Sequence, residues 1–217
     1  MAITYPRDFP TDAAFSSINF SLGDISVQNI LQSGAVQTME IGPSLWRADF
    51  TTVPVDATGR RVWQAWELSL RNGRTFLAWD PEKRFPAAYG RSVLALTRAG
   101  GGAFDGTATL ASVAATTVSV TGLPAGYTAK AGDMLSFDWS GLRVLHMLTE
   151  DVTANGAGAA TFPVHPPVQT SPAPAGGAAV ALMRPACTMK IIPNTFDAPA
   201  SGMFAPVKFQ AVQAITP

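Results

Sequence analysis

The 217-residue sequence predicts a mainly β protein with one packed α-helix and an inserted small β-barrel. The segment 34–86 holds four of the five tryptophans and has the pattern of a strand, a helix and a strand in turn. Residues 94–184 are poor in aromatic side chains and rich in Ala, Gly, Thr and Val, with short alternating runs between turns. Aromatic residues return after residue 190, which relates the C-terminus to the N-terminal part.

Several strands are expected before the helix. Residues 14–22 place apolar side chains mostly two apart, as a half-buried strand does, and residues 19–31 continue a similar pattern. Residues 36–41 and 45–50 alternate as well, so the prediction is a hairpin in which these two strands pair across the turn between them. The inward face of the second strand carries Trp46, Ala48 and Phe50.

A single α-helix is predicted over residues 56–70. Asp56 follows the strand-ending Pro54 and can accept a hydrogen bond from a free amide at the helix start. The apolar stripe of this helix is predicted to be Val62, Trp63, Trp66 and Leu70. Its polar side carries the candidate subunit contact, which consists of Arg60, Arg61, Gln64 and Glu67. Asn72 and Gly73 end the helix, and residues 75–79 resume as a strand.

The middle of the chain is predicted to fold as a small barrel. Residues 135–139 and 142–148 are expected to form a hairpin around Ser140 and Gly141. Further strands are expected at 117–123, 160–164 and 178–183.

The predicted domain organisation is discontinuous. Residues 207–215 have the cleanest alternation in the chain, and their composition matches that of the first eighty residues. The prediction is therefore one discontinuous domain made of residues 1–91 and 185–217, with residues 92–184 inserted into it as the barrel.

The composition favours a protein that contacts other subunits. Hydrophobic residues make up 47% of the chain and charged residues only 14%, whereas average domains have roughly 25% charged residues. So few charges suggest that other subunits cover part of the surface. The formal net charge is +0, so no basic field indicates nucleic-acid recognition or binding to an anionic membrane. Neither a signal peptide nor a membrane span is expected, because no suitable apolar run occurs.

No catalytic, cofactor or metal site is predicted. His146 and His165 lack the spacing of metal ligands, and the single Cys187 is expected to be a buried, inert thiol. Most of the acidic residues fit helix caps and turns better than the carboxylate pair of a glycosidase. The acidic residues considered for that pair are Asp49, Asp56, Asp80, Glu82, Asp133 and Asp138.

The order of several segments resembles the distal tail proteins of siphophages and of related tail-like particles, gene transfer agents included. The N-terminal segments are VQT (36–38), LWRADF (45–50), WQAWELSLRNG (63–73) and TFLAWDP (75–81). The segments of the insert are KAGDMLSF (130–137), VTANGAG (152–158) and FPVHPPV (162–168). These motifs are structural and the family has no catalytic motif, so the resemblance carries over no functional residue.

The resemblance implies a split β-barrel or sandwich with one packed helix, carrying an inserted barrel that is similar to the oligosaccharide/oligonucleotide-binding fold. It also implies a hexameric ring between the tail tube protein and the baseplate hub protein. Such a subunit would be made in the cytoplasm of a bacterial host and would reside in the tail tip of the virion. Two alternatives remain open, namely a carbohydrate-binding module of a phage tail tip that recognises host surface glycans, and a glycosidase or other wall-degrading enzyme.

Overall fold

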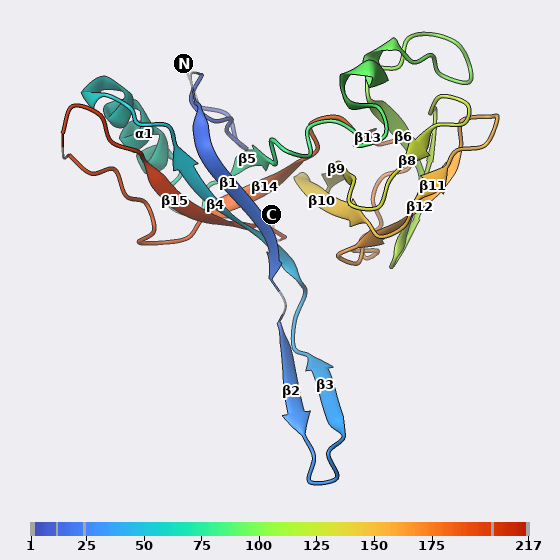
Figure 1. The fold of residues 1–217 in the computed structure, drawn as a ribbon, viewed down its shortest axis with the longest axis horizontal. Helices are drawn as coiled ribbons and strands as arrows, with labels where there is room; N and C mark the ends of the chain where they lie inside the picture. The colour runs from blue at the N-terminus through green and yellow to red at the C-terminus, as the bar shows by residue number, and fades with distance from the viewer. Residues whose placement is uncertain (1–2, 12, 24, 201, 216–217) are drawn as a thin grey trace.

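The computed structural model of the chain describes residues 3–11, 13–23, 25–200 and 202–215. Figure 1 shows a helix-covered sheet on one side, a barrel on the other, and a two-stranded hairpin that points away from both. The prediction of a mainly β chain with one packed helix and an inserted small barrel is confirmed.

A five-stranded antiparallel sheet forms the first half of the molecule, and it curls into a half-barrel. Its strands, in spatial order, are β1 (Phe15–Gly23), β4 (Leu45–Thr52), β15 (Lys208–Gln213), β14 (Ala186–Ile191) and β5 (Phe76–Trp79). Because β15 lies between β4 and β14, the end of the chain completes a sheet that the N-terminal strands begin.

Helix α1 (Ala57–Ser69) covers one face of this sheet with a core of aromatic rings. Trp63 and Trp66 are buried, and their rings meet edge to face at 5.3 Å. Beneath them, Phe50 of β4 stacks on Phe209 of β15 at 4.7 Å. Aromatic side chains bury about 150–250 Å² each, so this cluster anchors the helix to both ends of the chain.

The predicted start of α1 is confirmed, but two positions of its predicted faces are wrong. The Asp56 side chain accepts a hydrogen bond of 2.7 Å from the Gly59 amide. Val62, expected in the stripe, is 50% exposed, and Arg60, expected on the polar side, is buried. Successive helical residues lie about 100° apart. The buried face is centred on Trp63, so residue 60, one turn earlier, lies on it and Val62 does not.

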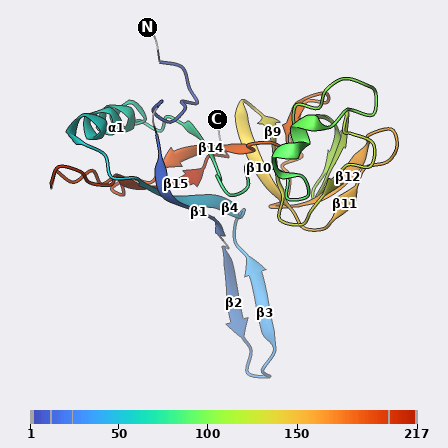
Figure 2. The same ribbon diagram turned by 45° about the horizontal axis from the view of Figure 1, so that its top comes forward.

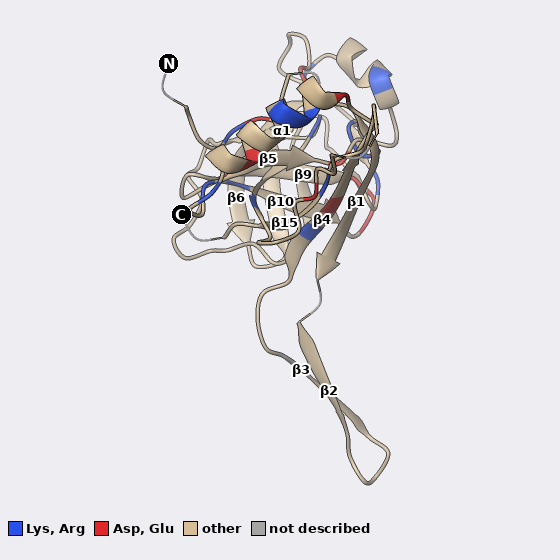
Figure 3. Ribbon diagram, turned by 90° about the vertical axis from the view of Figure 1, so that its left-hand side faces the viewer, with Lys and Arg blue, Asp and Glu red and all other residues tan. Residues whose placement is uncertain are grey.

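The hairpin predicted across residues 41–45 is wrong. The strand β3 (Val36–Glu40) pairs with β2 (Ser26–Ile30), whereas β4 pairs with β1 and β15. Both edges of β4 are therefore occupied, which leaves no position for β3 beside it. The β2–β3 pair instead lies between β1 and β4 in the sequence, beyond the end of the β1–β4 pair. In each of three views β2 and β3 project from the sheet (Figures 1 to 3).

The second half of the molecule is a closed six-stranded barrel (Figure 2). Its strands, in order around the barrel, are β10 (Leu142–Leu148), β12 (Ala160–His165), β7 (Thr117–Thr121), β6 (Thr107–Ala114), β13 (Ala179–Ala181) and β9 (Met134–Trp139). The predicted turn at Ser140 and Gly141 is confirmed, with φ of 49° and 80°. The shorter elements are the 3-10 helix η1 (Gly90–Ala95) and the paired strands β8 (Thr128–Ala129) and β11 (Val152–Thr153).

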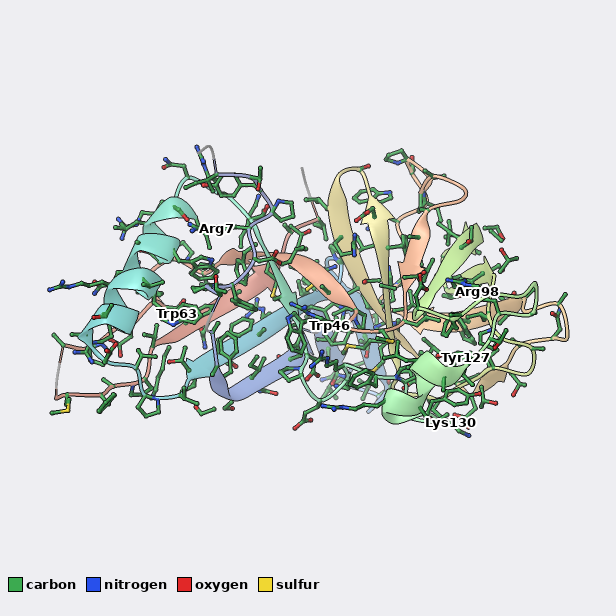
Figure 4. All side chains as sticks on the ribbon, turned by 90° about the horizontal axis from the view of Figure 1, so that it is seen from above. Arg7, Trp46, Trp63, Arg98, Tyr127 and Lys130 are labelled. Carbon is green, nitrogen blue, oxygen red and sulfur yellow. The ribbon has the colours of Figure 1, made fainter. Side chains whose placement is uncertain are left out.

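Packed side chains join the sheet to the barrel. Met134 and Leu145 of the barrel belong to the same buried cluster as Trp46 of β4. The backbone amide of Arg143 also donates a hydrogen bond of 2.8 Å to the Thr188 hydroxyl on β14. Seen from above, Trp46 lies where the two halves meet (Figure 4). These contacts extend the sheet core into the barrel wall.

Candidate functional site

The hairpin arm, residues 25–41, exposes large apolar side chains on both of its faces. Val27 lies opposite Met39 on one face, and Ile30 lies opposite Val36 on the other. Ile30 is 73% exposed and Met39 is 68% exposed. The other exposed apolar residues of the arm are Ile25, Val27, Leu31, Val36 and Ile41. Because an isolated two-stranded hairpin is marginal in water, the arm is suited to a surface supplied by another chain.

Except for Glu40 at the end of β3, the arm also lacks the charges that usually protect exposed strands. Residues 25–39 contain no Asp, Glu, Lys or Arg. In Figure 3 the charged ribbon segments lie in the body of the molecule, and β2 and β3 are tan along most of their length. Natural edge strands commonly carry Lys, Pro or other features that prevent pairing with a second chain. An arm with a single charged residue therefore permits pairing or packing with another protein.

The four candidate contact residues of α1 occupy different environments. Arg60 points inward, and its guanidinium donates a hydrogen bond of 3.0 Å to the Val55 carbonyl. Arg61 and Gln64 are exposed. Glu67 is half-buried and forms an ion pair of 3.1 Å with Arg71. Arg61 and Gln64 are thus accessible to another subunit, whereas Arg60 acts within the fold.

A groove of about 970 Å³ lies between the end of α1, the connection to β5, and the end of β14. Sequence reasoning did not identify it, because its residues come from distant segments. Its basic residues are Arg47, Arg71, Arg74 and Lys190, and Glu67 is its acidic residue. Its apolar residues include Leu70, Ile191, Phe196 and Val212. We call this region the cationic groove.

A smaller cavity of about 150 Å³ lies beside the two histidines. His146 is buried, stacks on Phe137 with 5.4 Å between ring centroids, and has its Nδ1 2.7 Å from the Pro166 carbonyl oxygen. Since a carbonyl only accepts, Nδ1 carries the proton. Burial lowers the pKa of His146 to about 4, so the ring is neutral near pH 7. His165 at the rim is exposed.

Several of the acidic residues considered for catalysis have structural roles. Asp80 accepts hydrogen bonds from the Glu82 amide and the Lys83 ammonium, both at 3.0 Å. Asp133 accepts bonds from the Ala87 and Lys130 amides. Among the described residues, no group of three or more His, Cys, Asp or Glu side chains could hold a metal ion.

Cys187 is fully buried in the core of the sheet. Its burial raises the pKa of the thiol far above the ordinary range. Nucleophilic cysteines instead need an accessible thiolate and a lowered pKa. Cys187 therefore serves as an apolar core residue.

Comparison with known proteins does not place the chain in a family. No family model matches the sequence, and no curated protein matches it. Within the described residues, no helix is long and apolar enough to cross a membrane. The fold and its surfaces define a class: a β-rich protein with an exposed apolar arm and a separate cationic groove.

Proposed function

We propose that the chain is a structural subunit of a distal tail ring, in which six copies connect a tail tube protein to a baseplate hub protein. The ring would form part of the virion tail tip after synthesis in the cytoplasm of a bacterial host. The resemblance of the sequence to distal tail proteins supports the tail location and the number six. The exposed surfaces of the chain support its assembly with other subunits.

The hairpin arm is the observation that carries this proposal. A folded monomer gains nothing by holding Ile30 and Met39 in water at the end of a projecting hairpin. Burial of the seven exposed apolar side chains of the arm against a neighbouring copy would stabilise the assembly and the arm together. An arm in every copy that reaches the next copy gives a head-to-tail contact. Such contacts form a ring when the rotation between copies closes, and a filament when it does not.

The form of the sheet is also consistent with a ring. The half-barrel ends at the edge strands β1 and β5, and the backbone of Arg7 already pairs with part of the β5 edge. Helix α1 covers one face, while the other face carries exposed polar residues such as Asp49, Lys208 and Gln210. Edge strands present backbone groups that can pair with a further strand. Half-barrels set side by side in a ring would cover the edge of β1.

The carbohydrate-binding alternative has less support. Sugar-binding modules stack aromatic faces on their ligand, so they need aromatic rings at the surface. Residues 92–184, which contain the barrel, have five aromatic residues. All five are buried: Phe104, Tyr127, Phe137, Trp139 and Phe162. Trp139 uses its indole N–H for a hydrogen bond of 2.7 Å to the Pro172 carbonyl.

Removal of the arm tests the proposal directly. Gly23 pairs with Leu45 where β1 and β4 leave the sheet, so an Asn-Gly turn can replace residues 24–44 without separating these strands. The intact chain should form particles of about 136 kDa, which is six copies of 22.7 kDa, and show rings by negative-stain electron microscopy. The shortened chain should remain folded and monomeric by light scattering.

A matched control separates the effect of changing the arm from the effect of adding a charge at an exposed apolar position. Leu94 on η1 is also exposed and apolar, so Leu94→Lys should leave ring formation unchanged, whereas Met39→Lys should prevent it. Rings formed equally well by the shortened chain would refute the role of the arm. An intact chain that stays monomeric at all concentrations, and forms no ring with the tube and hub proteins, would refute the proposed function.

A further inference from the structure

The cationic groove is assembled by the register of three strands. Lys190 of β14 pairs with Val212 of β15, which in turn pairs with Arg47 of β4. Directly paired residues project to the same side of a sheet, so these three side chains form one row. Adjacent strands lie about 4.8 Å apart, which places the Lys190 and Arg47 backbones roughly 10 Å from each other. Arg74 enters the same groove from the connection between α1 and β5.

Within the described residues, the basic groups of this groove outnumber the acidic ones. Four basic residues and one acidic residue line it, and the acid, Glu67, is paired with Arg71 at 3.1 Å. Among the described residues, Arg47, Arg74 and Lys190 have no ion pair. The Arg74 guanidinium lies 4.6 Å from the centre of the Tyr5 ring, an attraction that needs no anion. In the part of the chain that the structure describes, three cations of the groove thus lack a carboxylate partner and can pair with an external one.

Apolar side chains supply the rest of the groove. Leu70 is buried, and Ile191, Phe196 and Val212 are half-buried. Half-buried apolar groups gain from a ligand that covers them, and cations beside them orient that ligand through its acids. A ligand that fits must therefore carry carboxylates and apolar side chains within a short length of chain.

We propose that the cationic groove binds an acidic, partly apolar peptide segment of a different protein. The arm of a second copy does not fit well, because its one acidic residue is Glu40 at the end of β3 and residues 25–39 have none. Nucleic acid fits less well, because the groove offers one aromatic ring, Phe196, for base stacking, and the rest of its apolar lining is aliphatic. This inference does not rest on ring formation, since every residue involved lies outside the arm.

Labelled synthetic peptides test the groove on the intact chain. An octapeptide that alternates Glu and Leu should bind in a fluorescence-anisotropy titration, and its affinity should fall as salt rises. Replacing Glu by Gln, or Leu by Ser, should weaken binding in each case. A single-stranded DNA 12-mer of greater negative charge should bind less tightly than the Glu and Leu peptide.

Paired variants identify the groove as the binding site. The double variant Arg47→Gln/Lys190→Gln should lose roughly ten-fold in affinity for the Glu and Leu peptide. The control Arg61→Gln/Arg91→Gln removes the same charge from two exposed positions outside the groove and should bind like the parent chain. The chain without its arm should also bind normally, which keeps this test separate from that of ring assembly.

Three outcomes would overturn the inference. One is that the Glu and Leu peptide does not bind. Another is that both double variants bind it equally, which would indicate a general charge effect. The third is that DNA binds more tightly than the peptide and loses its affinity in the groove variant, which would indicate a polyanion surface. Circular dichroism of every variant confirms that its fold is retained.

Discussion

The indole N–H of Trp46 donates a hydrogen bond of 2.8 Å to the backbone carbonyl of Leu145. Trp46 belongs to β4 of the half-barrel and Leu145 to β10 of the closed barrel, so this bond joins the two halves of the molecule. Both residues are buried. A buried carbonyl without a partner loses its hydration without compensation. Removing the donor therefore lowers the free energy of unfolding by more than the net contribution of the hydrogen bond itself.

Trp46→Phe should therefore destabilise the whole chain. The substitution removes the donor, leaves the Leu145 carbonyl without this partner and creates space beside Met134. We expect the free energy of unfolding to fall by about 2–3 kcal/mol in urea denaturation followed by circular dichroism. Trp79→Phe, at a half-buried ring, is the control and should cost less. Equal losses in the two variants would contradict the importance of the junction.

The cap of α1 gives a second prediction. Asp56→Ala removes the acceptor of the 2.7 Å hydrogen bond from the Gly59 amide, so α1 should lose about 1 kcal/mol of stability. Thermal unfolding should show this loss, whereas Asp56→Ser, which keeps an oxygen acceptor, should recover most of it. A serine variant as unstable as the alanine variant would show that the cap is not the cause.

His146 makes stability depend on pH. The folded state holds its pKa at about 4, whereas the unfolded state has the ordinary value of 6.5. Below pH 6.5 the unfolded chain takes up a proton that the folded chain excludes, so stability should fall as pH falls from 6.5 to 4. The expected change is about 3 kcal/mol.

Denaturation measured across this pH range checks the effect of His146. His146→Gln removes the titrating group and should flatten the slope between pH 4 and 6.5. His165→Gln removes a neighbouring charge that contributes less than burial does to the low pKa of His146, so it should reduce the slope only in part. If the parent chain showed the same slope as His146→Gln, the buried ring would not be the source.

The sequence allowed prediction of features that depend on local spacing. Trp63 and Trp66, three residues apart, indicated the buried side of α1, and Ser140 and Gly141 indicated a turn between two strands. The exact limits of the helix stripe were not predictable from polarity alone. Arg60 has a long aliphatic stem that packs inward while its guanidinium finds a backbone carbonyl, so a charged residue occupies a core position.

Features that depend on strand partners were not predictable in this way. Alternation shows that β3 is a strand, but it does not say which strand lies beside it. The cationic groove has no local signal at all, because strand register brings Arg47 and Lys190 together across 143 positions of sequence. The arm did leave a sequence signal, namely the uncharged run 25–39. That run alone does not predict that the hairpin projects from the sheet, as Figure 1 shows it to do.

Gly158 provides a sharp test of the barrel. Its φ is +71°, and an added Cβ would lie 2.1 Å from the Leu123 carbonyl oxygen and 2.9 Å from the Ala99 side chain. Gly158→Ala should destabilise the chain by more than about 2 kcal/mol, because backbone has to move. Gly156→Ala lies in the same turn with nothing within 4 Å of the new methyl group. It should change stability by less than about 0.5 kcal/mol in the same urea titration.

Arg61 tests whether the outer side of α1 belongs to the ring contact. Its side chain is exposed, so Arg61→Glu should change the free energy of unfolding by less than about 0.5 kcal/mol. If a neighbouring subunit contacts it, the concentration needed for ring assembly should rise roughly ten-fold by light scattering. Arg60→Ala is the opposite control, since it removes the bond to Val55 and should cost about 1 kcal/mol of fold stability. Unchanged assembly of Arg61→Glu would exclude this side of the helix and leave the arm as the principal contact.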